Sequence, residues 1–373
     1  MKLKSKIYLS IMIGFFSFFN SVFSQDVRVD RNVRKAERIV NKLIRKKKVP
    51  GIAITVTKSK EIVWQKGYGY ADIKAKTPVD PKKTIFRIAS VSKPLSATVL
   101  AKMVEEKQID LDASLYNYVP YFPRKKYDFN IRQLGGHLAG IRTYKGREFF
   151  NKKKLSIREG VALFENDSLL FEPGTAYAYN SYDWVLISLA IQEITKEPFE
   201  KTLKEKVLEP LELKNTFPDL NDNTIANKAS FYSRRGKRRF RQAAKVDNYF
   251  KLAGGGYLST SEDVAKLGNT YLDKSFIDEK VASQFINSQK IDEKLTYYGL
   301  GWEASFDKQG RPYYGHTGNG IGGYAIFRVY PNQEMVFSML TNVTNPGIEE
   351  EIDQVINNVL EQMDDTTSQK SAL

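Results

Sequence analysis

A serine and a lysine three residues apart are the pair in this sequence best suited to covalent chemistry. Ser90 and Lys93 stand within the stretch 86–95, and residues three apart on a helix lie on one face, so their hydroxyl and amine can meet. A serine becomes a nucleophile when a neighbouring base takes its proton. A lysine can be that base when burial or another cation destabilises its ammonium. The pair therefore predicts a Ser-Lys nucleophile for acyl transfer.

The same spacing occurs a second time, at Ser305 and Lys308. A Gln-Gly pair follows it and no helical pattern begins there, so we interpret this copy as a hairpin turn. After Ser90, in contrast, apolar residues recur at helical spacing to about Lys107. The positive N-terminal end of such a helix suits an oxyanion. We therefore predict that Ser90 is the nucleophile.

Two further segments could complete a site around this pair. Tyr179 and Ser181 lie in a loop just before a predicted helix, and a tyrosine near a lysine can exist partly as phenolate and relay protons. His316, Thr317 and Gly318 belong to a strand that enters a glycine turn. The bare backbone of that turn could offer an N–H group to an oxyanion, with the histidine and threonine at its rim.

The elements that must position these residues come from both ends of the chain. Residues 52–67 and 298–342 read as short β-strands, 27–47 and 347–363 as amphipathic helices, and the region between the strands as mostly helical. Within that region the stretch 254–260 reads as a glycine-rich loop. We therefore predict an α+β fold, with one antiparallel sheet flanked by the N- and C-terminal helices and a mostly helical insertion. The predicted parts are a signal peptide (1–24), a sheet part (25–85 and 296–365), a mostly helical part (86–295) and a polar tail (366–373), with one domain spanning about 35–360.

The first residues are typical of an export signal. Residues 1–6 are basic, 7–19 are almost entirely apolar, and small residues precede a cleavage position after Ser24. We expect an exported protein, periplasmic or secreted, with no stable membrane span after cleavage. An uncleaved signal anchor is the alternative.

Composition excludes several kinds of chemistry. The 373 residues contain no cysteine and two histidines, which rules out disulfides, thiolate catalysis and a multi-histidine metal site. We expect no metal and no cofactor. Of the two histidines, we interpret His137 as structural, satisfying backbone groups around its glycine turn. The net charge is +15, but the densest basic run, 233–241, reads as a solvated hairpin, so no nucleic-acid partner is predicted.

Three motifs in this order resemble those of the penicillin-recognising serine hydrolases. They are Ser90-Val91-Ser92-Lys93, the tyrosine element at Tyr179, and His316-Thr317-Gly318. Their context is similar to the branch shared by class C β-lactamases, D-Ala-D-Ala carboxypeptidases and related esterases, over about residues 35–359. Within that branch the chain looks most like the mitochondrial serine β-lactamase-like proteases. The stretches that carry this closer similarity are 118–123, 136–142 and 246–260.

The resemblance implies a covalent acyl-enzyme mechanism without metal or cofactor. Ser90 would attack a carbonyl group while Lys93 and Tyr179 move its proton. The backbone N–H groups of Ser90 and Asn319 would hold the oxyanion. The residues implied in substrate binding are Ser181, His316, Thr317 and Gly318.

The chain departs from the family pattern at two positions. Ser181 stands where the family usually has asparagine, and His316 stands where the β-lactamases usually have lysine. A histidine with an ordinary pKa of about 6.5 is at most partly charged at neutral pH and would anchor a carboxylate less firmly. We therefore expect a small peptide, amide or ester as substrate, with β-lactams as candidate covalent ligands.

Several alternatives stay open at this point. One is a true β-lactamase or D-Ala-D-Ala carboxypeptidase, and another is a non-catalytic scaffold or binding protein with this fold. The sequence also leaves open whether Lys93 or Tyr179 is the principal base, because the two groups can titrate together. It does not reveal the oligomeric state.

Overall fold

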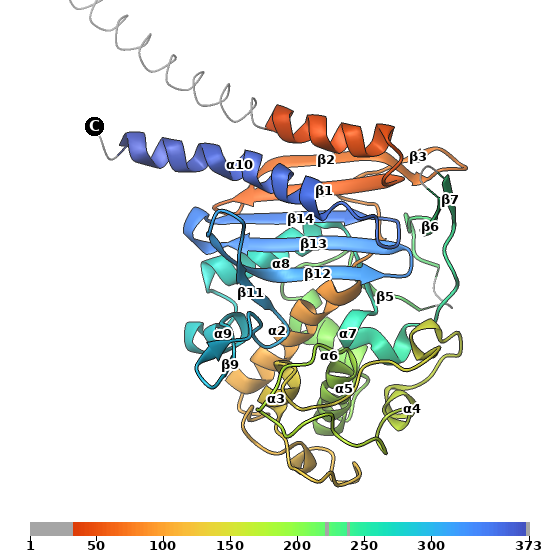
Figure 1. Cartoon of the computed structure of the whole chain (residues 1–373), viewed down its shortest axis with the longest axis vertical. Helices are drawn as coiled ribbons and strands as arrows, with labels where there is room; N and C mark the ends of the chain where they lie inside the picture. The colour runs from red at the N-terminus through yellow and green to blue at the C-terminus, as the bar shows by residue number, and fades with distance from the viewer. Residues whose placement is uncertain (1–32, 221–223, 237–238, 371–373) are drawn as a thin grey trace, which may run out of the picture. The chain divides into compact units, whose positions relative to one another are not determined.

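The computed structural model describes residues 33–220, 224–236 and 239–370 (Figure 1). Lys47–Gly347 form one compact unit, and the segments before and after it form another. The predicted signal peptide lies outside the described residues. None of the helices in the described part of the chain combines the length and apolar character that crossing a membrane requires.

The smaller unit contains the two helices predicted at the ends of the chain. The first covers residues 33–45, and the second is α10 (Glu349–Lys370). Ala36, Val40 and Leu43 recur at helical spacing in the first helix and are buried. Both helices are therefore present, and their placement against the sheet stays a prediction.

The larger unit is built on a seven-stranded antiparallel sheet, which confirms the predicted α+β class. The strand order is β11-β12-β13-β14-β1-β2-β3, so strands from the two ends of this unit pair at its centre. In that central pair Ala53 of β1 lies opposite Leu340 of β14, and all but the last residue of β1 are buried. The strands are β1 (Gly51–Lys58), β2 (Glu61–Asp72), β3 (Thr77–Pro78), β11 (Glu303–Phe306), β12 (Pro312–Gly320), β13 (Gly323–Tyr330) and β14 (Met335–Thr341).

Helix α8 (Ser261–Asp273) covers one face of this sheet. The hydroxyl groups of Thr55 in β1 and Ser261 are 2.9 Å apart. A Cβ atom at Gly268 would lie 2.6 Å from Val336 of β14, so the helix can approach the strand this closely only with glycine there. The sheet is thereby shielded from water on the α8 side.

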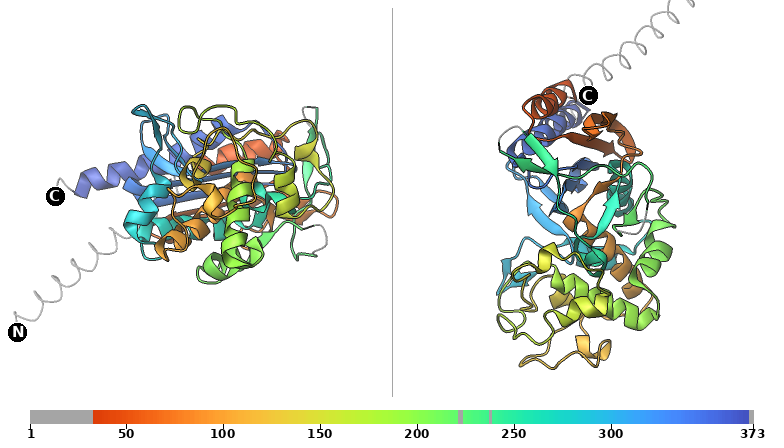
Figure 2. Two further views of the ribbon diagram at one scale, coloured as in Figure 1. Left: turned by 90° about the horizontal axis from the view of Figure 1, so that it is seen from below. Right: turned by 90° about the vertical axis from the view of Figure 1, so that its right-hand side faces the viewer.

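The remaining helices lie beyond β12, away from β2 (Figures 1 and 2). Helix α2 runs through their middle and is buried along almost its whole length. The other α-helices are α3 (Ile131–Gly135), α4 (Ile157–Ala162), α5 (Tyr182–Thr195), α6 (Phe199–Leu203), α7 (Leu252–Gly255) and α9 (Glu279–Ile286), after α2 (Ser92–Glu105). The shorter 3₁₀ and π turns are η1 (Ala89–Val91), η2 (Leu115–Asn117), η3 (Glu148–Phe150), η4 (Lys204–Leu208), η5 (Tyr249–Lys251) and η6 (Pro331–Gln333).

Short strands complete the larger unit and test two predictions. The basic run forms a hairpin of β6 (Tyr232–Arg235) and β7 (Arg239–Gln242), as predicted. The stretch 254–260, predicted as a glycine-rich loop, instead contains the end of α7 and β8 (Tyr257–Ser259). That prediction was wrong because β8 is held by pairing with strands distant in sequence. These strands are β4 (Phe86–Arg87) and β5 (Phe217–Pro218), and a separate pair consists of β9 (Lys290–Ile291) and β10 (Lys294–Leu295).

Candidate active site

Ser90 lies in the turn η1, which leads directly into α2. The preceding Ala89 has φ +47°, a left-handed conformation that is uncommon for a residue with a side chain. Gly318 of β12 packs against this turn, where a Cβ atom would be 2.1 Å from the carbonyl oxygen of Ile88 and 3.3 Å from Ser90 N. Glycine thus allows β12 to come close to the turn, and Ser90 is held between that strand and the start of α2.

Lys93 is fully buried and lies one helical turn after Ser90. Burial lowers the pKa of its ammonium to about 7, although the negative charges of Asp183 and Glu303 act to raise it. An amine with this pKa is partly unprotonated at neutral pH and can accept a proton. The oxygen atoms around Nζ are Tyr179 OH and the Gly254 carbonyl, both at 2.7 Å, Ser90 Oγ at 3.3 Å and Ser181 Oγ at 3.4 Å.

The hydroxyl group of Tyr179 connects Lys93 to Ser90. It accepts a hydrogen bond from Lys93 Nζ at 2.7 Å and donates one to Ser90 Oγ at 2.9 Å. Although 41% of the Tyr179 surface is exposed, its hydroxyl lies between these two groups, and burial raises the pKa of the phenol above its ordinary value. The predicted phenolate form is therefore disfavoured. Lys93 is the better proton acceptor of the two, and neutral Tyr179 is suited to relay the proton.

A buried pair, His137 and Asp183, supports the tyrosine from behind. His137 Nδ1 is 2.8 Å from Asp183 Oδ2, and both side chains are fully buried. The ring of His137 packs edge-on against that of Tyr179, with centroids 4.6 Å apart. The prediction that His137 satisfies backbone groups was wrong about its partner, which is a carboxylate on α5. Burial raises the pKa of Asp183 and lowers that of His137, so the imidazole stays neutral.

His316 lies inside the protein, with 2% of its surface exposed. Its Nδ1 is 2.7 Å from the carbonyl oxygen of Thr317, and its Nε2 is 2.9 Å from Tyr298 OH. Because a carbonyl can only accept, Nδ1 carries the proton and Nε2 accepts from the tyrosine. Burial lowers the pKa of His316 to about 4, so the ring is neutral at neutral pH. Both ring nitrogens are engaged by the protein, and the predicted contact between His316 and substrate stays a prediction.

Thr317 already holds a carboxylate from this chain. Its N–H donates to Glu303 Oε1 at 2.9 Å, and its hydroxyl donates to Glu303 Oε2 at 3.4 Å. Glu303 begins β11 and keeps 27% of its side chain exposed. Thr317 adjoins Gly318, which packs against the Ser90 turn, and its predicted role in substrate binding stays a prediction. Its two donors are used by a negative charge that would repel a second carboxylate.

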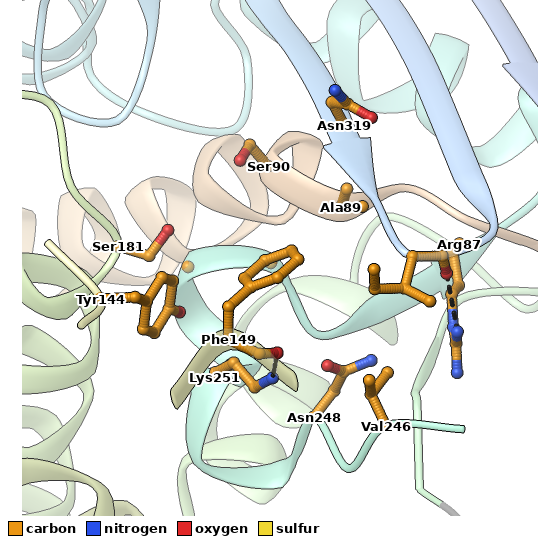
Figure 3. Close-up of a pocket in the computed structure, with 14 residues that line it drawn as sticks. Arg87, Ala89, Ser90, Tyr144, Phe149, Ser181, Val246, Asn248, Lys251 and Asn319 are labelled. Carbon is orange, nitrogen blue, oxygen red and sulfur yellow. Dashed lines mark hydrogen bonds between the residues drawn. The ribbon is translucent and has the colours of Figure 1, made fainter. Parts of the chain in front are cut away.

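A cavity opens beside Ser90 (Figure 3). Among the predicted site residues, Ser90, Ser181 and Asn319 line it, and Lys93 and Tyr179 reach Ser90 from outside its lining. Asn180 does not replace the asparagine that the family usually has at Ser181. It is buried, and its side-chain amide bonds to Asp183 and to backbone carbonyls.

Several residues of the site were missed by reasoning from the sequence. Tyr298 lies in a stretch that carries the family resemblance, and Asp183 lies at the start of a predicted helix just after the tyrosine motif, so position along the chain could have indicated both. Glu303 and Lys251 have no local signal, because pairing of distant strands and turns brings them to the site. Within the described ranges, no group of three metal-ligating side chains gathers.

Comparison with known proteins finds related sequences. The sequence model of the family named Beta-lactamase matches residues 36–361. The human protein "Serine beta-lactamase-like protein LACTB, mitochondrial" is 26% identical over 380 residues, which cover 76% of this chain and 69% of that protein. The predicted resemblance to this group of proteins is thereby confirmed.

Solved structures show the same fold. The D-amino acid amidase of Ochrobactrum anthropi SV3, in complex with D-phenylalanine, superimposes with a TM-score of 0.79 at 20% identity, over 90% of this chain and 99% of the amidase. EstCE1, described as a hydrolase with promiscuous acyltransferase activity, superimposes with a TM-score of 0.75 at 19% identity, over 88% of this chain and 99% of EstCE1.

Proposed function

Because this chain belongs to the Beta-lactamase family, whose fold is that of serine hydrolases, we propose that it hydrolyses amide or ester bonds through an acyl-enzyme on Ser90. The observation that carries the proposal is the continuous hydrogen-bonded path from Ser90 Oγ through Tyr179 OH to Lys93 Nζ. The path ends on an amine whose pKa, about 7, lets it accept a proton at neutral pH.

In the first half of the proposed reaction, Ser90 Oγ attacks the substrate carbonyl carbon. Its proton passes to Tyr179 OH, and the phenol proton passes to unprotonated Lys93. The carbonyl oxygen becomes an oxyanion, for which the backbone N–H groups of Ser90 and Asn319 are the proposed donors. The bond to the leaving group then breaks, and the leaving group takes the proton back from Lys93 through Tyr179.

In the second half, water replaces the leaving group. Lys93 accepts a proton from the water through Tyr179, and the resulting hydroxide attacks the acyl carbon. The ester bond to Ser90 breaks, Ser90 Oγ regains a proton by the same path, and a free carboxylic acid leaves. The same three side chains therefore serve both halves, as microscopic reversibility requires.

The position of Glu303 supports amides and esters that lack a carboxylate next to the scissile bond. A β-lactam or a D-Ala-D-Ala peptide carries such a carboxylate, and at Thr317 it would meet Glu303. The neutral state of His316 provides no compensating charge. We therefore rank peptidase, amidase or esterase activity above antibiotic hydrolysis. The amide and acyl substrates of the two structural neighbours lie in the same class.

Covalent labelling tests the nucleophile directly. A fluorophosphonate probe should add one phosphonyl group to the folded protein, on Ser90, as located by peptide mass spectrometry. Ser90→Ala should abolish the adduct. Ser305→Ala, which removes the serine of the second Ser-x-x-Lys copy in β11, should leave it unchanged. Absence of any Ser90 adduct in folded protein would instead favour a non-catalytic protein with this fold.

A substrate panel then tests the reaction class. We expect turnover of p-nitrophenyl esters or amino acid amides that is lost in Ser90→Ala, and slower turnover of nitrocefin. Nitrocefin hydrolysis faster than that of every ester and amide would contradict the ranking and support a β-lactamase.

Export is a separate proposal that rests on the basic and apolar residues of 1–24. Mass spectrometry of the protein recovered from the native cell should show a mature chain that begins at Gln25. An intact N-terminus on a soluble cytoplasmic protein would overturn it.

A further inference from the structure

A second lysine lines the cavity beside Ser90 and has no role in the proton path. Lys251 ends the turn η5 and keeps 4% of its surface exposed. Its ammonium donates to the carbonyl oxygen of Phe149 at 3.0 Å. In Figure 3, Ser90 and Asn319 lie along one side of the cavity, and Lys251 and Asn248 lie along the other. The cavity therefore has the nucleophile at one end and a buried amine at the other.

The other cation of the cavity, Arg87, is already neutralised. Its Nε donates to Asp219 Oδ2 at 2.6 Å, and its Nη1 donates to the carbonyl oxygen of Ile321 at 2.7 Å. Asp219 also accepts from Asn248 at 2.8 Å and from Lys228 at 2.9 Å. The Asp219 carboxylate is thus already used by other groups.

Lys251 differs from Arg87 in having no carboxylate within ion-pair distance among the residues that the structure describes, although the charges of Asp247 and Asp219 raise its pKa from further away. An ammonium has three N–H donors, and one carbonyl satisfies a single donor. A buried ammonium with no carboxylate in direct contact is incompletely compensated, so such a site favours an anion that enters from outside. Burial lowers the pKa of Lys251 to about 8, which still leaves the amine mostly protonated at neutral pH.

The direction of the substrate follows from the proton path. The leaving group must receive its proton from Tyr179, so it departs on the side where Tyr179 and Glu303 lie. The acyl group then extends the other way, from Ser90 into the cavity toward Lys251. On the basis of the proposed function, we propose that Lys251 binds a carboxylate on the acyl part of the substrate. The substrate class is then an amide or ester whose acyl chain ends in a carboxylate several atoms from the scissile carbonyl.

The surroundings of the cavity favour an anion as well. The hairpin of β6 and β7 is anchored beside it, because a Cβ atom at Gly322, next to the cavity residue Ile321, would be 2.4 Å from Phe231 and 3.1 Å from Ala243. Arginines of this hairpin are exposed to solvent. A group of like charges beside a cavity raises the local concentration of an oppositely charged ligand. The exposed arginines are Arg235, Arg239 and Arg241.

A pair of esters that differ in one charge tests the proposal. The anionic probe is mono-p-nitrophenyl glutarate, and the neutral probe is the same compound with its free carboxylate methylated. The wild-type protein should hydrolyse the anionic ester with a kcat/KM at least about tenfold higher. Lys251→Met should remove this preference, lowering kcat/KM for the anionic ester by about tenfold or more and leaving the neutral ester within about threefold.

Two controls accompany this variant. Lys251→Arg keeps the cation and should retain most of the preference for the anionic ester. Lys125→Met removes another partly buried lysine that donates to backbone carbonyls, but outside this cavity, and should change neither rate. Unchanged fluorophosphonate labelling of Ser90 in Lys251→Met would show that the reacting groups remain in place.

The outcomes separate this inference from the proposed function. If the wild-type protein hydrolyses the neutral ester through Ser90 but shows no charge preference, or if Lys251→Met keeps the preference, the inference falls and the proposed function stands. If neither ester is hydrolysed and Ser90 takes no label, the inference about Lys251 and the proposed function are both contradicted.

Discussion

The protonation state of Lys93 should control the rate at the level of single residues. Its pKa is lowered to about 7, and only the unprotonated amine can accept the proton of Ser90. We expect kcat/KM for a neutral ester to rise about tenfold per pH unit below pH 7 and to level off above it. A profile that is flat between pH 5.5 and 8.5 would contradict Lys93 as the base.

Replacement of Glu303 should move this profile in a defined direction. The carboxylate of Glu303 raises the pKa of Lys93, because a nearby negative charge favours the ammonium. In Glu303→Gln the pKa of Lys93 should therefore fall, and the rising limb of kcat/KM should move to lower pH. A shift to higher pH would mean that Glu303 does not act on Lys93 through its charge. Penicillin labelling of Ser90 should also become faster, since Thr317 loses the competing carboxylate.

Removal of the Tyr179 hydroxyl should break the proposed proton path while the aromatic ring stays in place. We expect Tyr179→Phe to lower kcat on esters by roughly 10²–10⁴-fold, the range found when a general acid–base group is lost. Tyr177→Phe changes an exposed neighbouring tyrosine and should keep activity within about threefold. Equal losses in the two variants would show that Tyr179 acts through packing rather than through its hydroxyl.

The pair proposed as nucleophile and base could be found from the sequence because its signal is local: Ser90 in the turn η1 and Lys93 at the start of α2 are three residues apart. The state of His316 could not, because it depends on burial and on Tyr298 across the site. The same holds for Glu303, which reaches Thr317 only because β11 pairs with β12. Spacing along the sequence does not predict which charged residue a neighbouring strand will bring to the site.

At the level of elements, the contact between β12 and the turn η1 should be sensitive to a single methyl group. A Cβ atom at Gly318 would overlap the carbonyl oxygen of Ile88, and it would also crowd Ser90 N. Gly318→Ala should therefore displace the strand from the nucleophile and slow fluorophosphonate labelling by about tenfold or more.

Gly255→Ala is a matched control for this contact. A Cβ atom at Gly255 would meet Ala89 and Ser90 at 3.6–3.9 Å, which are ordinary van der Waals distances. We expect normal labelling and an unchanged melting temperature in this variant. Loss of labelling in Gly255→Ala but not in Gly318→Ala would show that the turn is held from the α7 side instead.

The elements themselves were predictable to different degrees. The spacing of apolar residues predicted long helices such as α2 and α5 and strands such as β1 and β13. The short strand β8 was not, because three residues carry no periodic signal and its partners β4 and β5 lie far away in sequence. Its glycine-rich flank favoured a loop, and tertiary pairing overrode that local preference.

For the larger unit as a whole, stability should depend on the central strand pair. Leu340 of β14 is fully buried and lies opposite Ala53 of β1 and Ala325 of β13. Leu340→Ala should lower the free energy of unfolding by about 2–5 kcal/mol and the melting temperature by roughly 5–15 °C. Ile62→Ala, at a β2 position with 48% of its surface exposed, should leave the melting temperature nearly unchanged. Similar melting temperatures for the two variants would place the stabilising core elsewhere.

The pairing of β1 with β14 also has a consequence for how the chain is made. Lys58 pairs with Met335, about 280 residues later in the sequence. At a synthesis rate of about 5–20 residues per second, a ribosome needs roughly 15–55 s to supply the second strand after the first. During that interval β1 and β2 can form a hairpin, but the other edge of β1 has no native partner. A newly made chain therefore carries one apolar strand with an unpaired edge until β14, the last strand that the structure describes, is available.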